Sequence, residues 1–217
     1  MVVADGMGGA VGGKLASKLA VEGIERFQSE HPLRDLQADS IGEWLKAAVS
    51  YANRSIWDRA EADRSVLGMG STIVVTVQFD SRLQIANVGD SRAYLFRDGR
   101  IKQLTEDHSE VADMILRGEL TPEEARISPY KNLINRCLGH EEQVEINQTT
   151  WKLQSDDWII LCSDGLPTVL RDEQIGDVLE SSDTPQRACE ELVNHTLSGG
   201  APDNVTVIAI RYAESIA

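Results

Sequence analysis

The sequence has 217 residues, 41% of them hydrophobic, which is enough length and apolar content for a sizeable buried core. Its 35 acidic and 21 basic residues give a formal net charge of −14, a sign that repels nucleic-acid phosphates and anionic lipid headgroups. We therefore expect no nucleic-acid partner and no membrane partner. The three cysteines show no CxxC spacing, which argues against a disulfide framework or a zinc site and favours a cytoplasmic location.

The first third of the chain predicts two helices. Apolar residues recur at helical spacing from about Gly12 to Gln28, and His31-Pro32 ends this segment. A second helix is predicted from about Ile41 to Ala62, because apolar side chains again recur along one side.

The middle of the chain predicts strands. Four short segments, 71–79, 83–88, 93–96 and 101–104, are separated by short turns that contain Asp80-Ser81, Gly89-Asp90-Ser91 and Asp98-Gly99. Strands that are joined by turns this short are expected to pair as antiparallel neighbours.

The remainder alternates between helices and strands. Helices are predicted at 109–117, 132–138, 172–179 and 185–197, and a final strand at 205–210. Residues 153–163 are expected to form one half of a hairpin, with 158–162 as its buried strand. No repeat or linker interrupts the pattern, so we predict a single α+β domain over residues 1–217.

Three aspartates stand at the ends of apolar strand segments. Asp5 and Asp164 each follow such a segment and precede a glycine, and Asp203 comes shortly before the last strand. Several carboxylates on one site repel one another unless a cation joins them, and oxygen ligands without His or Cys suit Mg²⁺ or Mn²⁺. A plain turn is the alternative for any single Asp-Gly pair, and Asp98-Gly99 is interpreted as one. Spacing alone does not separate Asp90 from the candidate ligands.

Six motifs, in order, resemble those of the bacterial metal-dependent serine/threonine protein phosphatases of the PPM, or type 2C, family. They are Val3-Ala4-Asp5-Gly6-Met7-Gly8-Gly9, Gly70-Ser71-Thr72, Ala86-Asn87-Val88-Gly89-Asp90-Ser91-Arg92, Leu104-Thr105-Glu106-Asp107-His108-Ser109, Leu161-Cys162-Ser163-Asp164-Gly165-Leu166 and Asp203-Asn204-Val205-Thr206. The resemblance spans nearly the whole chain. It implies two stacked antiparallel β-sheets flanked by helices, an α-β-β-α sandwich with a binuclear metal centre at one end.

The resemblance also implies roles for individual residues. Asp5 bridges two Mg²⁺ or Mn²⁺ ions and the carbonyl of Gly6 binds one of them, while Asp164 and Asp203 complete the site. Asp107 matches a position that helps Asp164 to hold a third, weaker metal. The segment 110–132 corresponds to a flap beside the active site.

The chemistry that the resemblance implies needs no side-chain nucleophile. A water that bridges the two cations attacks phosphorus and releases the serine or threonine hydroxyl of a phosphoprotein. We expect the protein to act as a monomer on substrates of a bacterial serine/threonine kinase. Arg92, which follows Asp90-Ser91, is expected to pair with an acidic neighbour rather than with phosphate.

One departure from the family pattern concerns the start of the sequence. Family members carry an earlier strand with a phosphate-gripping arginine, whereas Met1 stands four residues before Asp5. The chain is therefore expected to be N-terminally truncated relative to the family pattern, and less active and less stable than a relative that has this strand. The alternative function is a catalytically weak or silent phosphatase-like protein that binds a phosphoprotein without hydrolysing it.

Overall fold

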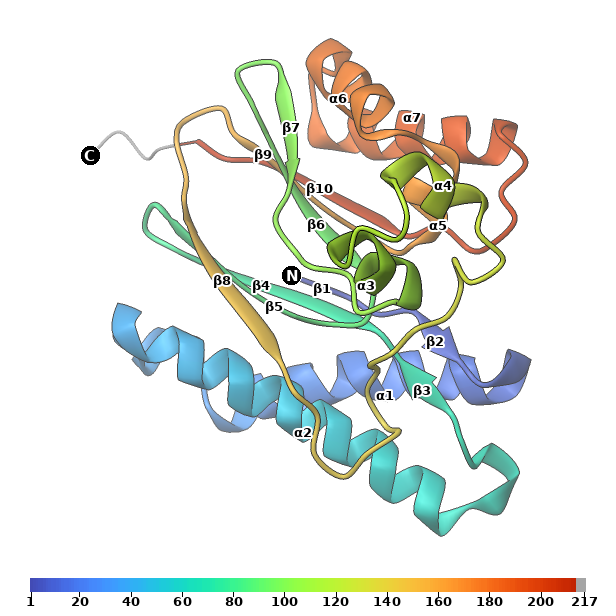
Figure 1. The fold of residues 1–217 in the computed structure, drawn as a ribbon. Helices are drawn as coiled ribbons and strands as arrows, with labels where there is room; N and C mark the ends of the chain where they lie inside the picture. The colour runs from blue at the N-terminus through green and yellow to red at the C-terminus, as the bar shows by residue number, and fades with distance from the viewer. Residues whose placement is uncertain (214–217) are drawn as a thin grey trace.

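In the computed structural model, which describes residues 1–213, two four-stranded antiparallel sheets pack face to face and a short two-stranded sheet extends the first (Figure 1). The first sheet has the order β1 (Val2–Val3), β4 (Ile73–Phe79), β5 (Arg82–Val88) and β8 (Asn147–Lys152). The second has the order β10 (Val207–Arg211), β9 (Trp158–Cys162), β6 (Arg92–Arg97) and β7 (Arg100–Gln103). The short sheet pairs β2 (Gly6–Met7) with β3 (Gly70–Ser71).

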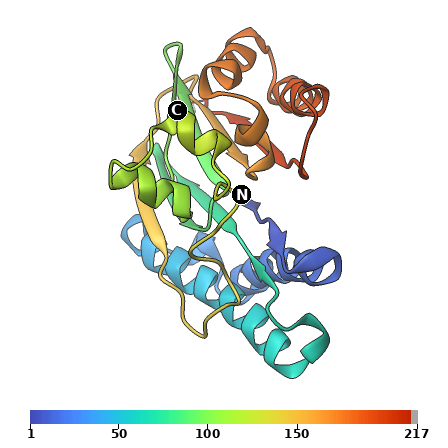
Figure 2. The ribbon, with the colours of Figure 1, turned by 45° about the vertical axis from the view of Figure 1, so that its right-hand side comes forward.

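Helices cover the outer face of each large sheet. The helices are α1 (Gly9–Glu30), α2 (Ile41–Ala62), α3 (Glu110–Leu116), α4 (Pro122–Ile127), α5 (Gly165–Val169), α6 (Asp172–Ser181) and α7 (Pro185–Ser198). Three short 3₁₀ turns lie at Leu33–Asp35, Ala38–Ser40 and Arg64–Val66. Helices α1 and α2 cover the first sheet, and α6 and α7 cover the second (Figure 1). The turned view shows the same layers, with α3 and α4 standing off to one side of the sandwich (Figure 2).

The strand β9 shows why the sequence folds into four layers. All five of its residues are buried. Ile159 and Leu161 belong to the core between the sheets, whereas Trp158, Ile160 and Cys162 pack into the core under α6 and α7. A strand that is buried on both faces needs apolar residues at every position, which explains its continuous apolar run. The predicted α+β sandwich is confirmed.

The prediction of four consecutive antiparallel neighbours is wrong at one point. Strands β4 and β5 pair, as do β6 and β7, but β5 and β6 belong to different sheets. The connection Gly89-Asp90-Ser91 crosses from one sheet to the other, and Gly89 has a φ of +96° there. Strands β5 and β6 are both mostly buried, so their apolar pattern does not indicate that the chain crosses between sheets.

Two further predictions are wrong between residues 122 and 163. The segment 153–163 is no hairpin half, because β8, which precedes β9, pairs with β5 in the other sheet. Residues 132–138 form turns and two isolated bridges rather than a helix. The helix in this region is α4, where Thr121 and Glu124 form a capping box, a signal that the sequence carries in Thr121-Pro122-Glu123-Glu124. The other predicted helices are confirmed with small shifts of their ends.

Candidate active site

The topology brings two of the three predicted strand-end aspartates to one end of the sandwich. Asp5 lies between β1 and β2, and Asp164 is the residue before α5. Strand β9 pairs with β10, with Cys162 opposite Val207, so the residues after β9 lie beside those that lead into β10. Two hydrogen bonds join them, from the Ser163 amide to the Thr206 carbonyl (3.1 Å) and from the Thr206 amide to Ser163 Oγ (3.1 Å).

Burial and mutual repulsion dominate the electrostatics of these acids. Burial, followed by the charges of Asp164 and Asp203, raises the pKa of Asp5 to about 7. The pKa of Asp164 is also raised, by burial and then by Asp203. The side chains of Asp5 and Asp164 lie close enough for each to shift the pKa of the other. Raised pKa values of this kind are expected where buried carboxylates lie together without enough positive charge nearby.

Asp203 stands farther out than the other two. It is exposed, and its Oδ1 accepts a hydrogen bond from the Asn204 amide (2.7 Å). Within residues 1–213, the His, Cys, Asp and Glu side chains include no group of three at metal-binding spacing. Asp203 nevertheless lies near enough for its charge to raise the pKa of both Asp5 and Asp164.

The buried oxygens of this site fit a hard cation. Asp164 Oδ1 is buried and has no hydrogen-bond partner among the described residues. An unpartnered buried carboxylate oxygen is costly, and a divalent cation would both satisfy it and remove the repulsion between Asp5 and Asp164. The donor set consists of oxygens only, which suits Mg²⁺ and Mn²⁺.

Gly6 is required for close packing at the site. A Cβ on Gly6 would lie 1.8 Å from the carbonyl oxygen of Gly13 in α1, and a Cβ on Gly13 would lie 2.6 Å from the carbonyl oxygen of Gly6. Strand β2 and helix α1 thus touch through bare backbone. The role of the Gly6 carbonyl as a metal ligand stays a prediction.

Asp90 is a fourth acid at this end, and it lies in the crossover between the sheets. It is 8% exposed, and burial, followed by the charge of Asp164, raises its pKa to about 7. The sequence holds a signal for it, because Val88-Gly89-Asp90 again places an acid just after a buried strand. Spacing alone does not separate Asp90 from the candidate ligands, and in the structure Asp90 is buried with its pKa raised by Asp164.

Asp107 is hydrogen-bonded to an arginine and a glutamine, and its role as a ligand of a third metal stays a prediction. Its carboxylate receives three hydrogen bonds from Arg92, at 2.6 to 3.0 Å, and one from Gln103 Nε2 at 2.8 Å. Arg92 also donates to the hydroxyl of the buried Tyr94 (2.8 Å). The prediction that Arg92 pairs with an acidic neighbour is confirmed. Both oxygens of Asp107 are engaged by this network.

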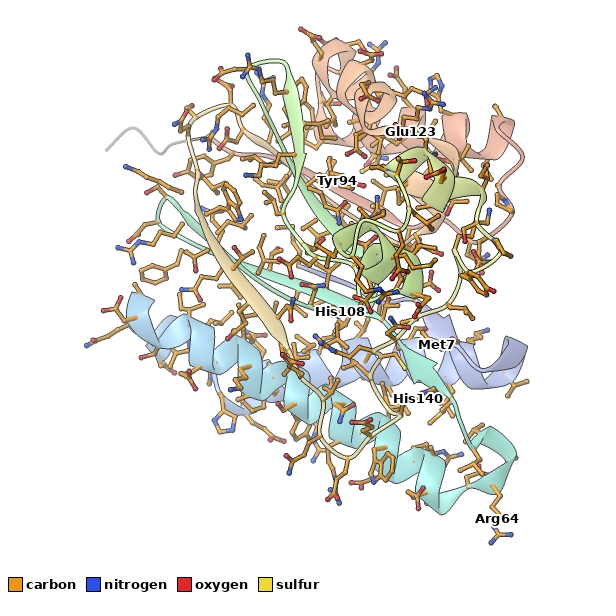
Figure 3. All side chains as sticks on the ribbon, viewed as in Figure 1. Met7, Arg64, Tyr94, His108, Glu123 and His140 are labelled. Atoms are coloured by element: carbon orange, nitrogen blue, oxygen red, sulfur yellow. The ribbon has the colours of Figure 1, made fainter. Side chains whose placement is uncertain are left out.

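His108 holds the crossover in place rather than facing solvent. Its amide donates to the Gly89 carbonyl (3.1 Å), and its Nδ1 accepts from the Gly89 amide (3.0 Å). Burial, followed by the charge of Arg136, lowers the pKa of His108, which keeps the ring neutral as this acceptor role requires. Figure 3 shows His108 and Met7 at this end of the molecule, with Glu123 on α4 above them and Arg64 at the far tip beyond α2.

The predicted flap, residues 110–132, holds α3 and α4. Helix α3 is half-buried along most of its length, whereas α4 buries Ala125. A hydrogen bond from Arg126 Nη2 in α4 to the carbonyl of Thr168 (3.3 Å) joins the segment to α5.

Comparison with known proteins identifies the class. Residues 1–198 match the family model of protein phosphatase 2C. The serine/threonine phosphatase stp of Listeria welshimeri is 36% identical over 97% of this chain and 83% of its own length. Among solved structures, Stp1 of Staphylococcus aureus has a TM-score of 0.91 at 33% identity, over 97% of this chain and 82% of that one. The catalytic domain of PstP in complex with two manganese ions has a TM-score of 0.84 at 35% identity, over 97% of this chain and 86% of that one.

The chain belongs to the protein phosphatase 2C family, and it is a metal-dependent protein phosphatase. The family resemblance of the sequence is confirmed. No helix in the described part of the chain is both long and apolar enough to cross a bilayer.

Proposed function

We propose that this phosphatase hydrolyses phosphoserine and phosphothreonine in proteins, with two Mg²⁺ or Mn²⁺ ions held by Asp5, Asp164, Asp203 and the Gly6 carbonyl. The observation that carries the proposal is the buried pair Asp5–Asp164, in which Asp164 Oδ1 has no partner among residues 1–213. The names of the relatives as serine/threonine phosphatases support the substrate class.

The bound ions and the residues of the chain would have separate roles in the reaction. When bound, the ions supply positive charge to the phosphoryl oxygens and lower the pKa of a water. The acids hold these ions, and the backbone of β2 and α1 fixes Asp5 through the contact between Gly6 and Gly13. No side chain is required as a nucleophile. Because the ions set the local field, a protein with a net charge of −14 can still bind a phosphate.

A third, weaker ion fits Asp90 better than Asp107. Asp164 is the charged neighbour that most raises the pKa of Asp90, whereas the oxygens of Asp107 already receive hydrogen bonds from Arg92 and Gln103. We therefore propose that Asp90 and Asp164 would hold the third ion.

The wider setting of the activity is also a proposal. We infer that the substrates are products of a bacterial serine/threonine kinase, that the chain acts as a monomer, and that it works in the cytoplasm. The bacterial relatives support the first point. The free thiols of Cys137, Cys162 and Cys189 support a reducing compartment.

Phosphate release from a phosphothreonine peptide tests the proposal. The wild type should hydrolyse the peptide with Mn²⁺ and lose this activity in EDTA. Asp164→Asn should lose at least about 100-fold in kcat/KM, because the charge of the metal stabilises the transition state by several kcal/mol. The matched control is Asp98→Asn, in the exposed turn after β6, which should keep full activity. A folded wild type without Mn²⁺-dependent turnover would instead favour the silent binding protein, an alternative that the phosphatases named above do not support.

A further inference from the structure

The ladder of hydrogen bonds between the N-terminal strands and β3–β4 is interrupted at Asp5. Val3 pairs with Val74 and Gly6 pairs with Ser71, so the two short ladders share one register, in which Asp5 stands opposite Thr72. Thr72 is the single residue between β3 and β4. The interruption of the sheet therefore falls at a proposed metal ligand.

A side-chain hydroxyl replaces a backbone acceptor at this interruption. The Thr72 amide donates to the Asp5 carbonyl (2.8 Å), as an antiparallel ladder requires. The Asp5 amide, however, donates to Thr72 Oγ1 (3.1 Å). The carbonyl of Thr72 instead accepts from Ser71 Oγ (2.8 Å). The ladder thus opens locally, and the Asp5 carboxylate meets Asp164 from the neighbouring sheet.

The same hydroxyl reaches the crossover between the sheets. Thr72 Oγ1 lies 2.7 Å from Ser91 Oγ, and both residues are 1% exposed. Ser91 follows Asp90 directly. On the other side of Asp90, Gly89 packs so closely on Thr72 that a Cβ there would lie 2.7 Å from Thr72 Cβ. Thr72 is therefore bonded to the Asp5 segment and packed against the Asp90 segment.

We propose that Thr72 is a positioning residue for the metal site, with its hydroxyl setting the separation of the two acid-bearing segments. The inference rests on the proposed function, because it assumes that Asp5 and Asp90 bind divalent ions. Thr72 itself is no ligand in this proposal. The Thr72 hydroxyl contacts both the Asp5 amide and Ser91 Oγ. Loss of this hydroxyl should let both segments move and should weaken ion binding.

Replacing the hydroxyl by a methyl group tests this role. Thr72→Val keeps the shape of the side chain, and calorimetric titration should show Mn²⁺ binding weakened by about 10-fold or more, in line with the loss of other groups that orient metal ligands. The Mn²⁺ concentration for half-maximal hydrolysis of p-nitrophenyl phosphate should rise in parallel. Thr72→Ser restores a hydroxyl at the same place and should bind Mn²⁺ within about 3-fold of the wild type.

The strand β4 offers a matched control four residues away. Thr76 is also 1% exposed, but its Oγ1 has no hydrogen-bond partner among the described residues. Thr76→Val makes the same chemical change inside β4 and should leave Mn²⁺ binding unaltered. Equal weakening by both variants would overturn the proposal, because it would show a general loss of packing.

Further outcomes separate this inference from the proposed function. Wild-type Mn²⁺ affinity in a folded Thr72→Val overturns the positioning role and leaves the phosphatase assignment intact. If Thr72→Val fails to fold, Ser91→Ala removes the other hydroxyl of the pair; weakened Mn²⁺ binding then supports the proposal, and unchanged binding contradicts it. A wild type that binds no Mn²⁺ overturns the proposed function and this inference with it.

Discussion

At the scale of single residues, the site is defined by carboxylates that the fold buries without compensating charge. Asp5 and Asp90 both have a pKa raised to about 7, and burial is the larger cause in each case. Arg92, which is half-buried, gives three hydrogen bonds to Asp107 and only partly offsets the raised pKa of Asp90 and Asp164. The metal-free protein therefore carries an electrostatic cost that a divalent cation removes.

This cost predicts a pH-dependent stability in EDTA. The folded-state pKa of Asp5 lies near 7, above its ordinary value of 3.8, so between these values the folded chain holds a proton that the unfolded chain has released. The free energy of unfolding should fall as the pH rises through this window. Asp5→Asn carries no such charge, so its stability relative to the wild type should increase from pH 4 to pH 7 and then level off.

Urea unfolding of both proteins across this pH range measures the effect. Saturating Mn²⁺ is the control, and it should reverse the order, leaving the wild type more stable than Asp5→Asn. A stability difference in EDTA that stays constant with pH would show that Asp5 is not strained in the folded state.

At the level of elements, local pattern predicts most helices and strands and the hairpins β4–β5 and β6–β7, but not the pairings between distant strands. Helix α2 has its predicted ends, because apolar spacing and caps are local signals. The crossing at Gly89 and the assignment of β8 to the first sheet depend on contacts between distant segments. The acids Asp5 and Asp164 were found from the strand-end pattern, whereas Thr72 lay in a motif whose role became visible only through its hydrogen bonds.

The contact between α1 and α2 makes a prediction about glycine. A Cβ on Gly23 would lie 2.8 Å from Cα of Ala52, so the two helices pack through this position. Gly23→Ala should destabilise the protein by about 1–3 kcal/mol through overpacking, despite the better helix propensity of alanine.

Gly42 is the matched control, in the first turn of α2. A Cβ there would meet only Gln84 Oε1, at 3.4 Å, so Gly42→Ala should be neutral or stabilise by about 0.5 kcal/mol. Thermal unfolding of both variants compares them. A stabilising Gly23→Ala would mean that α1 and α2 do not pack this closely.

At the scale of the whole molecule, the four layers serve to bring chain segments that are far apart in sequence to one end of the sandwich. Asp5 comes from the first sheet, Asp164 from the second, and Asp90 from the crossover between them. The relatives named above share this architecture, with TM-scores of 0.91 and 0.84. A cation that joins these acids therefore also joins the two sheets, so metal binding and folding stability should be coupled.

Calorimetric titration of Mn²⁺ into the wild type and Asp164→Asn shows whether the buried acid pair binds the ions. We predict that the wild type binds two ions tightly, with a rise in melting temperature, and that Asp164→Asn loses at least one of them while remaining folded in EDTA. Binding of two ions to Asp164→Asn with wild-type affinity would contradict the account, because the buried acid pair would then not be the metal site.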